Sequence, residues 1–358
     1  MYGGAMIDSG GFGCIYKPAL RCSNSKKRYN GISKLQIKKY GLQEYNTTKD
    51  IEKILKKIPD YTKYYIVKVS KCIPNALTSE DKKKMDCYAL TKKNITKKNI
   101  NNNLSKLVSI QMEYGGPALK STIKNIRSYD ELMIVHNKVK TFFNEGLLPM
   151  NRVGIIHSDM KMANLLYNDS IKVIDWGFTI NLNQKFEIRE KKFHFNLPFS
   201  VVLFERGKYI KMYLENKAVS KNNIREFVMK IMEENKYDRH IEYLEDLYKN
   251  LKIENINLYI IEYLTEVMFK FTDKNTKEFN VDKYFDEVYI YNCDIWGFIM
   301  MFIEMIDYMN FELLEKTSTK PFIDMIFTLI DKYLLNIKYA TEKFNPSEIY
   351  NEIDKIGE

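Results

Sequence analysis

Apolar and polar residues alternate along much of the first third of the chain, a pattern typical of β-strands. Residues 2–20 combine this alternation with several glycines, which predicts two strands joined by a tight turn. Residues 31–35, 64–73 and 107–114 predict three more strands. The start of the chain is therefore expected to form a small, strand-rich lobe.

One segment of this lobe has helical periodicity instead. Between residues 42 and 58, apolar side chains recur at three- and four-residue spacing, and Pro59 supplies a stop. These apolar positions are Ile51, Ile54, Leu55 and Ile58. We expect one main helix beside the strands.

Residues 91–106 consist almost entirely of Lys, Asn, Thr and Ile. This composition predicts an exposed loop. A nucleic-acid-binding segment is the alternative, but the segment lacks the aromatic side chains on which bases stack. No nucleic-acid partner is expected.

The second part of the chain has long helical periodicity, over residues 132–148 and then 223–339. Only residues 154–180 are typical of short strands and loops there. The chain therefore predicts an α+β fold, with a small antiparallel β-rich lobe followed by a large, mainly helical one.

The chain has 358 residues, of which 45% are hydrophobic and 28% charged. This length suffices for one large two-lobed domain or two ordinary ones. Lys and Arg number 56 against 46 Asp and Glu, giving a net charge of +10. Such a charge favours anionic partners, although a solvated basic surface would also produce it.

The cysteines are odd in number and scattered, and they form no CxxC pair. They are Cys14, Cys22, Cys72, Cys87 and Cys293. A reducing compartment fits this usage best. The N-terminus lacks the pattern of a signal peptide, and the most apolar stretch, 295–303, is too short to span a bilayer. These features predict a soluble cytoplasmic protein.

The chemistry is concentrated in one run, His157-Ser-Asp159-Met-Lys161-Met-Ala-Asn164. Phosphoryl transfer from ATP needs cations to neutralise the phosphate and a carboxylate to orient the acceptor hydroxyl. Asp159 is the candidate carboxylate and Lys161 the candidate cation. Asn164 can ligate Mg²⁺ through its side-chain oxygen.

A second motif follows at short range. The apolar run Ile171-Lys-Val-Ile174 delivers Asp175 in Asp175-Trp176-Gly177. Asp175 would be an anionic metal ligand at the end of a strand, since Mg²⁺ prefers hard oxygen ligands. Because the two motifs occur together at this spacing, chance is a poor explanation.

These motifs resemble those of the eukaryotic-type protein kinase superfamily, and the resemblance covers most of the chain. Gly10-Gly11-Phe12-Gly13-Cys14-Ile15 is similar to the family's phosphate-covering loop, although Asp8 stands where the first glycine is usual. The resemblance implies a bilobal fold with an N-lobe of residues 1–112, a hinge of 113–117 and a C-lobe of 118–358. ATP and Mg²⁺ are the cofactors it implies.

The resemblance also assigns the nucleotide-binding residues. The strand lysine that grips phosphates is Lys34 or Lys68, and the order of lysine strand, helix and further strands favours Lys34. Glu44 would pair with it from the helix face. The remaining candidates are Gly10, Gly11 and Gly13 in the turn, Glu113 and Gly115 in the hinge, and Ile15, Ile32 and Leu166 around the adenine.

Several residues depart from the family pattern. Ser158 replaces the arginine that in many members receives an activation-loop phosphate, so switching by that route is not expected. Trp176 replaces the usual phenylalanine. No Ala-Pro-Glu follows Asp175, the nearest landmark being Asn196-Leu-Pro198-Phe-Ser200, and residues 205–290 resemble a helical insertion. Asp294 would hold the catalytic-loop backbone.

The sequence thus predicts an ATP-dependent protein kinase that phosphorylates Ser or Thr hydroxyls of proteins. Lys161 resembles the serine/threonine branch, and the composition resembles kinases of large DNA viruses, which would place the chain in host cytoplasm or virion. Two alternatives stay open: a catalytically silent kinase-like scaffold, and a small-molecule phosphotransferase of related fold.

Overall fold

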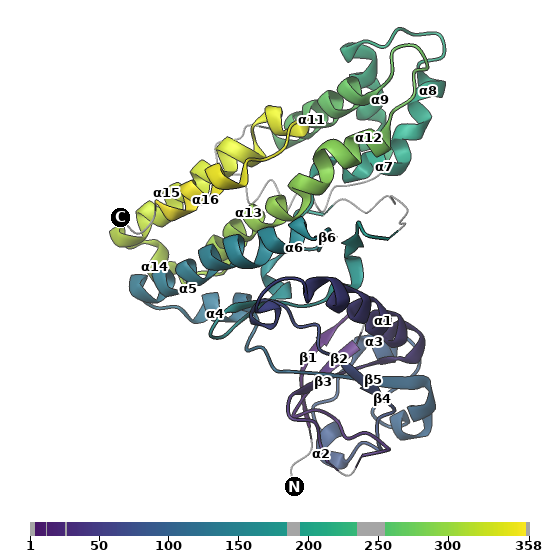
Figure 1. The fold of residues 1–358 in the computed structure, drawn as a ribbon, viewed down its shortest axis with the longest axis vertical. Coiled ribbons are helices and arrows are strands. Elements are labelled where there is room, and N and C mark those ends of the chain that lie inside the picture. Colours follow the sequence, from purple (N-terminus) through teal and green to yellow (C-terminus); the bar gives the residue numbers. More distant parts are fainter. Residues whose placement is uncertain (1–3, 12, 26, 185–193, 235–254, 356–358) are drawn as a thin grey trace. The chain divides into compact units, whose positions relative to one another are not determined.

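The computed structural model describes residues 4–11, 13–25, 27–184, 194–234 and 255–355 (Figure 1). Its chain forms two compact units. The first, here called the N-unit, contains Met1–Pro117 and Leu166–Gly177. The second, the C-unit, contains Ala118–Leu165 and Phe178–Glu358. The segment that carries Asp175 therefore belongs to the N-unit.

The N-unit is built on a five-stranded antiparallel sheet with the order β1-β2-β3-β5-β4. The strands are β1 (Ala5–Gly10), β2 (Gly13–Lys17), β3 (Ile32–Ile37), β4 (Ser70–Cys72) and β5 (Leu107–Met112). A hairpin joins β1 to β2, with Gly10 opposite Gly13. The predicted strand pair with a glycine-rich turn is present.

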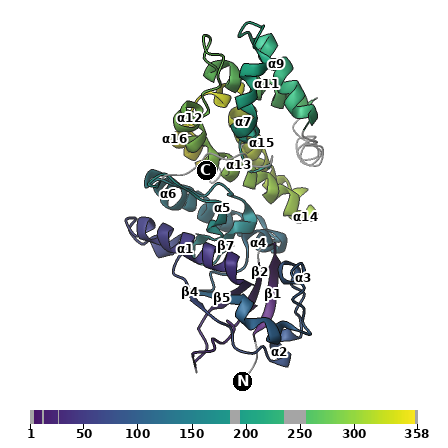
Figure 2. The ribbon, with the colours of Figure 1, turned by 90° about the vertical axis from the view of Figure 1, so that its right-hand side faces the viewer.

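The central strand β3 presents different side chains to the two faces of the sheet, because successive residues of a strand point to opposite sides. On one face α1 (Lys38–Leu55) packs against β3 and β5. On the other face α3 (Tyr88–Thr91) contacts β1, β2 and β3. Figure 2 shows the two helices on opposite sides of the strands.

The helix α1 begins earlier and ends earlier than the periodicity predicts. It buries Ile51 and Leu55, as expected, while Ile58 is buried beyond the helix end. Gly41 lies so close to β5 that a Cβ there would meet Val108 Cγ1 at 2.3 Å. A larger residue at position 41 would push the helix away from the sheet.

The predicted strand over residues 64–73 is mostly wrong, since only Ser70–Cys72 pairs with β5. A single-turn helix, η1 (Tyr61–Lys63), precedes this segment. Tyr65 then pairs with Val173 in an isolated parallel bridge. The apolar side chains of residues 64–67 are buried, which explains the strand-like sequence pattern without a long strand.

The prediction of an exposed loop over residues 91–106 is right only in part, because most of these residues are exposed but two of them are buried. It follows α2 (Ser79–Lys82) and α3, and it ends in the helical turns of η2 (Ile100–Lys106). Ile95 and Ile100 are buried in a cluster that also contains Tyr16 and Leu35 of the sheet. The composition did not predict this packing, because the two buried isoleucines are widely spaced and most of their neighbours are exposed.

The N-unit contains two disulfides: Cys14–Cys87 joins β2 to the residue before α3, and Cys22–Cys72 joins the chain after β2 to β4. Their Cα atoms lie 5.9 and 5.6 Å apart, separations typical of disulfides. Cys293 is the free cysteine among the described residues, and it is buried. The sequence had offered no pairing, because residues 73 and 50 positions apart carry no local signal. The reducing compartment stays a prediction.

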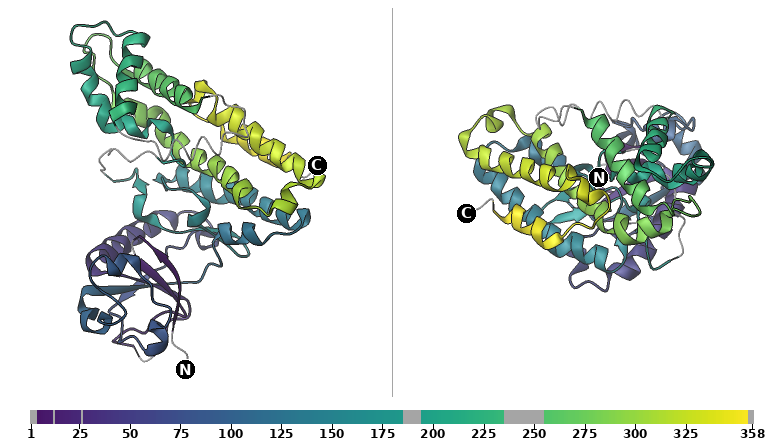
Figure 3. Two further views of the ribbon diagram at one scale, coloured as in Figure 1. Left: turned by 180° about the vertical axis from the view of Figure 1, so that it is seen from behind. Right: turned by 90° about the horizontal axis from the view of Figure 1, so that it is seen from above.

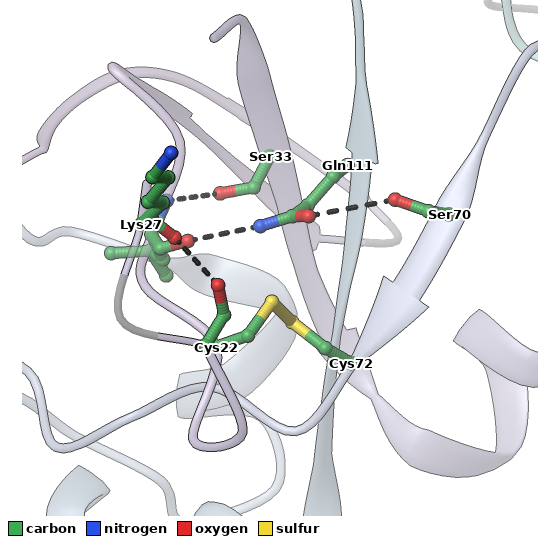
Figure 4. Close-up of a disulfide and its surroundings, with 8 residues drawn as sticks. Cys22, Lys27, Ser33, Ser70, Cys72 and Gln111 are labelled. Atoms are coloured by element: carbon green, nitrogen blue, oxygen red, sulfur yellow. Dashed lines mark hydrogen bonds between the residues drawn. A yellow bond between two sulfur atoms is a disulfide. The ribbon is translucent and has the colours of Figure 1, made fainter. Parts of the chain in front are cut away.

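Hydrogen bonds hold the chain near the second disulfide (Figure 4). The buried hydroxyl of Ser33 accepts the backbone N–H of Leu20 at 2.8 Å. The side-chain amide of Gln111 donates to the Leu20 carbonyl at 3.2 Å, and its oxygen lies 3.5 Å from the Ser70 hydroxyl. The chain after β2 is therefore anchored to β3 and β5.

The C-unit is mainly helical, and its green to yellow helices are drawn in Figures 1 and 3. Its helices are α4 (Leu119–Asn125), α5 (Tyr129–Phe142), α6 (Leu148–Arg152), α7 (Leu203–Arg206), α8 (Ile210–Tyr213), α9 (Lys221–Glu234), α11 (Ile256–Phe271), α12 (Val281–Tyr284), α13 (Ile290–Tyr308), α14 (Phe311–Leu314), α15 (Lys320–Leu329) and α16 (Pro346–Asp354). The predicted α+β class, with a small antiparallel β-rich first part and a mainly helical second part, is confirmed.

The short elements around the motifs are also strand-like, as the sequence predicts. In the C-unit β6 (Ile155–Ile156) pairs with β9 (Ile180–Asn181). A second pair joins β7 (Leu165–Tyr167) to β8 (Ile171–Val173). Between β6 and β7 lies the turn η4 (Met162–Asn164).

The centre of the C-unit is α13, which is buried on nearly all sides from Asn292 to Met305. It packs against α4 and α15. The continuous helical run Val281–Tyr308 is the one described helix long and apolar enough to cross a membrane, and 83% of its apolar window is buried. The core helix of a soluble protein has the same properties.

Part of the predicted insertion at 205–290 is helical in the structure. α8, α9, α11 and α12 lie within these bounds, and α9 packs against α11. Residues 235–254 are outside the described residues. That the segment is an insertion, and that the whole chain is one kinase domain, stay predictions.

The disulfides can be tested by counting thiols. We expect one reactive thiol after denaturation without reductant and five after reduction, measured by alkylation and mass spectrometry. Replacing both Cys22 and Cys72 by Ser should lower the free energy of unfolding by about 2–4 kcal/mol. Cys293→Ser is the control for loss of a buried thiol. Five reactive thiols without reductant would contradict the pairing.

The buried His136 on α5 should make the C-unit sensitive to acid. Burial lowers the pKa of His136 to about 4, while its bond to the Ile353 carbonyl at 3.0 Å opposes this. The unfolded chain takes up this proton near pH 6.5, so stability present above that pH is lost as the pH falls towards 4.

Between pH 7.5 and 5, wild-type protein should therefore lose about 2 kcal/mol more unfolding free energy than His136→Gln. Glutamine keeps an N–H donor but does not titrate. Denaturant unfolding at both pH values measures the difference, and pH 7.5 and 9 serve as the control interval. Equal acid losses in both proteins would rule out this role of His136.

Candidate active site

The predicted catalytic loop lies between β6 and β7, and Asp159 is at the centre of its hydrogen bonds. The Lys161 ammonium lies 3.0 and 2.9 Å from the two carboxylate oxygens of Asp159. Asn164 donates through Nδ2 to the Asp159 carboxylate at 2.9 Å and to its carbonyl at 2.8 Å. The structure therefore brings these three predicted residues together in the C-unit.

The environment of Asp159 keeps its carboxyl group ionised. Burial alone would raise its pKa, but the Lys161 charge and hydrogen bond and the Asn196 amide outweigh it. The pKa of Asp159 is therefore lowered from its ordinary value. A carboxylate in this state accepts hydrogen bonds and can orient a hydroxyl group.

Asn196 is a residue of this site that the sequence argument missed. Its Nδ2 donates to Asp159 Oδ1 at 3.0 Å and to the Met160 carbonyl at 3.2 Å. The side chain is buried, and its Oδ1 has no hydrogen-bond partner among the described residues. The sequence marks Asn196-Leu-Pro198 only as the nearest motif after Asp175. Nothing in this run indicates that Asn196 contacts a residue 37 positions earlier.

The central helix α13 holds the backbone of the loop. Asp294 accepts the N–H groups of His157 and Ser158, both at 2.8 Å, and the Asn151 amide at 2.7 Å. The predicted contact of Asp294 is confirmed. Ten residues later Glu304, which the sequence argument did not single out, accepts the Met162 N–H at 3.0 Å.

Ser158, at the position where the sequence resemblance implies an arginine, contacts the segment after the second motif. Its backbone has a left-handed φ of 52°, which few non-glycine residues adopt. Its hydroxyl donates to the Phe178 carbonyl, just beyond Asp175-Trp176-Gly177. Within the C-unit, this bond links the catalytic loop to the segment that follows the second motif.

In the N-unit, Lys34 and Glu44 form an ion pair between β3 and α1. Lys34 Nζ lies 2.9 and 2.8 Å from the Glu44 oxygens, and both side chains are mostly buried. Gln36, two residues along β3, donates to the same carboxylate at 2.6 Å. Lys68, the alternative lysine, lies 5.5 Å from the ring centre of Tyr61 instead.

The glycine-rich turn has space around it. A Cβ added at Gly11 would meet no atom within 4 Å, whereas one at Gly13 would meet Leu35 O at 2.6 Å. Gly13 is therefore needed for close packing of β2 on β3, and Gly10 and Gly11 leave the tip uncovered. Ile15, two residues along β2 from Gly13, is partly buried.

The predicted hinge follows β5. Gly115 lies close to Leu166, because a Cβ there would meet Leu166 Cδ1 at 2.8 Å. Glu113 forms a partly buried ion pair with Lys172 at 2.7 Å. Ile32 and Leu166 are both buried. The structure thus places these predicted adenine-site residues in one unit, although no adenine contact follows from it.

Asp175 is also in the N-unit, at the end of β8 in a left-handed conformation with φ 66°. The next side chain fixes this turn, since Trp176 Nε1 donates to the Ile66 carbonyl at 3.0 Å and its ring contacts Tyr65. No cluster of three or more His, Cys, Asp or Glu side chains suited to a metal occurs in the described parts of the chain.

Two groups of predicted residues therefore exist, one in each unit. The N-unit holds Asp175, the Lys34–Glu44 pair, the glycines and the hinge, and the C-unit holds Asp159, Lys161 and Asn164. Their catalytic and binding roles stay predictions.

The Asn196 contact gives a direct test of the Asp159 environment. Asn196→Ala removes a donor to the carboxylate, so the pKa of Asp159 should rise by about one unit. Carbon-13 NMR titration of the Asp side chains measures it. Asn183→Ala, at an exposed asparagine of the same unit, is the control. An unchanged pKa in Asn196→Ala would show that the amide does not act on Asp159.

Comparison with known proteins gives little sequence information. No family model matches the chain, and no curated protein matches it. Among solved structures, it is similar to the crystal structure of the kinase domain of PF14_0431, with 15% sequence identity and a TM-score of 0.37. The match covers 88% of this chain and 93% of that one. No activity follows from a likeness of fold, and the resemblance to viral kinases stays a prediction.

Proposed function

We propose that this protein is an ATP-dependent protein kinase that transfers the γ-phosphoryl group to Ser or Thr hydroxyls of proteins. The observation that carries the proposal is the state of Asp159. Its carboxylate is held by an ammonium and two side-chain amides, is mostly buried, and has a lowered pKa. A buried carboxylate fixed in this way, next to a lysine, suits the orientation of an acceptor hydroxyl.

The N-unit supports the same function through Lys34. A lysine paired with Glu44 is held in one orientation, and a fixed cation of this kind can hold phosphate oxygens. Gln36 adds a second donor to the carboxylate, so Glu44 is itself fixed on α1. The pair supports Lys34, rather than Lys68, as the phosphate-binding lysine.

The glycine-rich hairpin fits an anionic ligand such as ATP. A Cβ added at Gly11 would meet no atom within 4 Å apart from its chain neighbours, and backbone N–H groups of such turns can bind phosphate oxygens. The partly buried Ile15 and the buried Ile32 and Leu166 offer apolar surface of the kind that suits an adenine ring. ATP is therefore the proposed nucleotide, with the hinge backbone at Glu113 and Gly115 beside it.

Asn164 and Asp175 are the proposed ligands of Mg²⁺. Asn164 uses its amide nitrogen on Asp159, which leaves its oxygen as the atom suited to a cation. Mg²⁺ commonly takes one or two protein oxygens together with substrate phosphates, so the lack of a larger acidic cluster among the described residues is compatible with it. Bound Mg·ATP would supply the transferable phosphoryl group and neutralise its charge.

Each residue of the catalytic loop has its own role in this proposal. Asp159 accepts a hydrogen bond from the acceptor hydroxyl and aligns its oxygen. Lys161, already at Asp159, adds positive charge where the phosphoryl group transfers. Ser158 ties the loop to the Phe178 carbonyl. This contact is consistent with a kinase whose activity does not require an activation-loop phosphate bound by an arginine at position 158.

The proposal is tested with purified protein, labelled Mg·ATP and a panel of protein substrates. Asp159→Asn should reduce transfer by about 10²- to 10⁴-fold, while circular dichroism and thermal unfolding stay unchanged. Asp169→Asn, at an exposed aspartate ten residues later in the chain, is the matched control and should keep full activity. Equal transfer by wild type and Asp159→Asn would refute the assigned role.

The two alternatives give different results in the same assay. A silent scaffold would show nucleotide binding but no transfer, and autophosphorylation that Asp175→Ala abolishes would exclude it. A small-molecule phosphotransferase would act on an aminoglycoside, choline or a sugar and not on proteins.

A further inference from the structure

The helix α4 of the C-unit carries only basic charged side chains. Lys120 and Lys124 lie one turn apart, Arg127 follows the helix, and no acidic residue occurs between positions 118 and 129. Like charges at this spacing slightly destabilise a helix. We call these three side chains the α4 basic face.

Contacts with α13 bring two of these charges to one place. Lys120 Nζ donates to the Tyr308 hydroxyl at 2.7 Å and lies 3.9 Å from the centre of its ring. Lys124 Nζ lies 4.9 Å from the same ring centre. A single tyrosine thus holds two ammonium groups that repel each other, and an anion beside them would relieve the repulsion.

The helix α4 is next to the catalytic loop. α4 packs against η4, the turn that ends at Asn164, and against α13. Burial raises the pKa of Glu304, and Lys120 and Lys161 are both near enough to lower it in part. Lys120 therefore lies in the same electrostatic environment as the lysine of the loop.

The acidic groups nearby compensate this charge only in part. Glu304 is buried and accepts the Met162 N–H. Asp307 on the same stretch of α13 is exposed, as are Asp130 and Glu131 at the start of α5, and Glu131 accepts the Arg127 N–H at 2.7 Å. These carboxylates offset Arg127, but neither Lys120 nor Lys124 forms an ion pair with a described carboxylate, so the surface around Tyr308 stays positive.

We propose that the α4 basic face selects protein substrates that carry acidic residues close to the phosphorylated Ser or Thr. This inference rests on the proposed function and names its substrate class. An extended peptide advances about 3.3 Å per residue, and α4 packs against the turn η4 of the loop, so α4 would meet side chains a few positions from a hydroxyl at Asp159. Three cations suit a short acidic segment better than nucleic acid, whose binding commonly uses six to ten phosphate contacts.

The test is a peptide series with one central Ser, in which Asp, Ala or Lys occupies each of the four positions on either side. Wild type should have about a five- to tenfold higher kcat/KM for Asp than for Ala at the best position. The preference should shrink as salt is raised, because exposed charges are screened.

Charge reversal identifies the residues. Lys124→Glu should remove most of the preference for Asp, and Lys120→Glu with Lys124→Glu should reverse it in favour of Lys. Lys230→Glu is the matched control, because Lys230 is also exposed and lies 4.9 Å from a tyrosine ring in the same unit. It should keep the wild-type preference. Because Lys120 is partly buried, thermal unfolding is used to confirm that the double variant is folded. If the double variant is unfolded, the result for Lys124→Glu alone decides the test.

Failure of this inference differs from failure of the proposed function. Transfer with no preference for Asp, or an unchanged preference in Lys124→Glu, overturns the inference and leaves the kinase activity intact. If no peptide or protein is phosphorylated, fluorescence anisotropy with the labelled Asp and Lys peptides decides. Binding of the Asp peptide that Lys124→Glu abolishes supports the surface, and equal binding of both peptides overturns it.

Discussion

The C-unit depends on one buried carboxylate, that of Asp294. Burial of an ionised group is costly unless donors surround it, and Asp294 receives two backbone N–H groups and one side-chain amide. The two N–H groups belong to His157 and Ser158, and the left-handed backbone of Ser158 forms part of the same turn. The geometry of the loop that carries Asp159 is therefore set by a residue more than a hundred positions later.

The same helix fixes the rest of the loop by close approach. Gly297 faces the loop so closely that a Cβ there would meet Met160 O at 2.6 Å and Asn196 O at 2.9 Å. Glu304 holds the Met162 N–H, and Trp296 donates to the Phe195 carbonyl at 3.2 Å. Because Asn196 is held in this way, its amide reaches Asp159. One helix thus positions both the carboxylate and its additional donor.

The N-unit uses the two faces of its sheet for different purposes. Leu35 points into the apolar cluster that contains the Cys14–Cys87 disulfide, while Lys34 and Gln36 point to Glu44 on α1. This division follows from the alternation of side chains along β3. The disulfide and the apolar cluster thus lie on the face of β3 opposite to the one that pairs with α1.

The sequence by itself determined the α+β class, the glycine-rich hairpin, the main helix and the motifs around Asp159 and Asp175, because each depends on local spacing or periodicity. It did not predict the fold of residues 91–106, the short extent of β4, either disulfide, or the contact of Asn196 with Asp159. These depend on pairs of residues far apart in the chain, such as Cys14 with Cys87, and hydrophobic pattern carries no information about such pairs. Only tertiary packing decides which distant donor reaches a given carboxylate and which widely spaced apolar residues share one core.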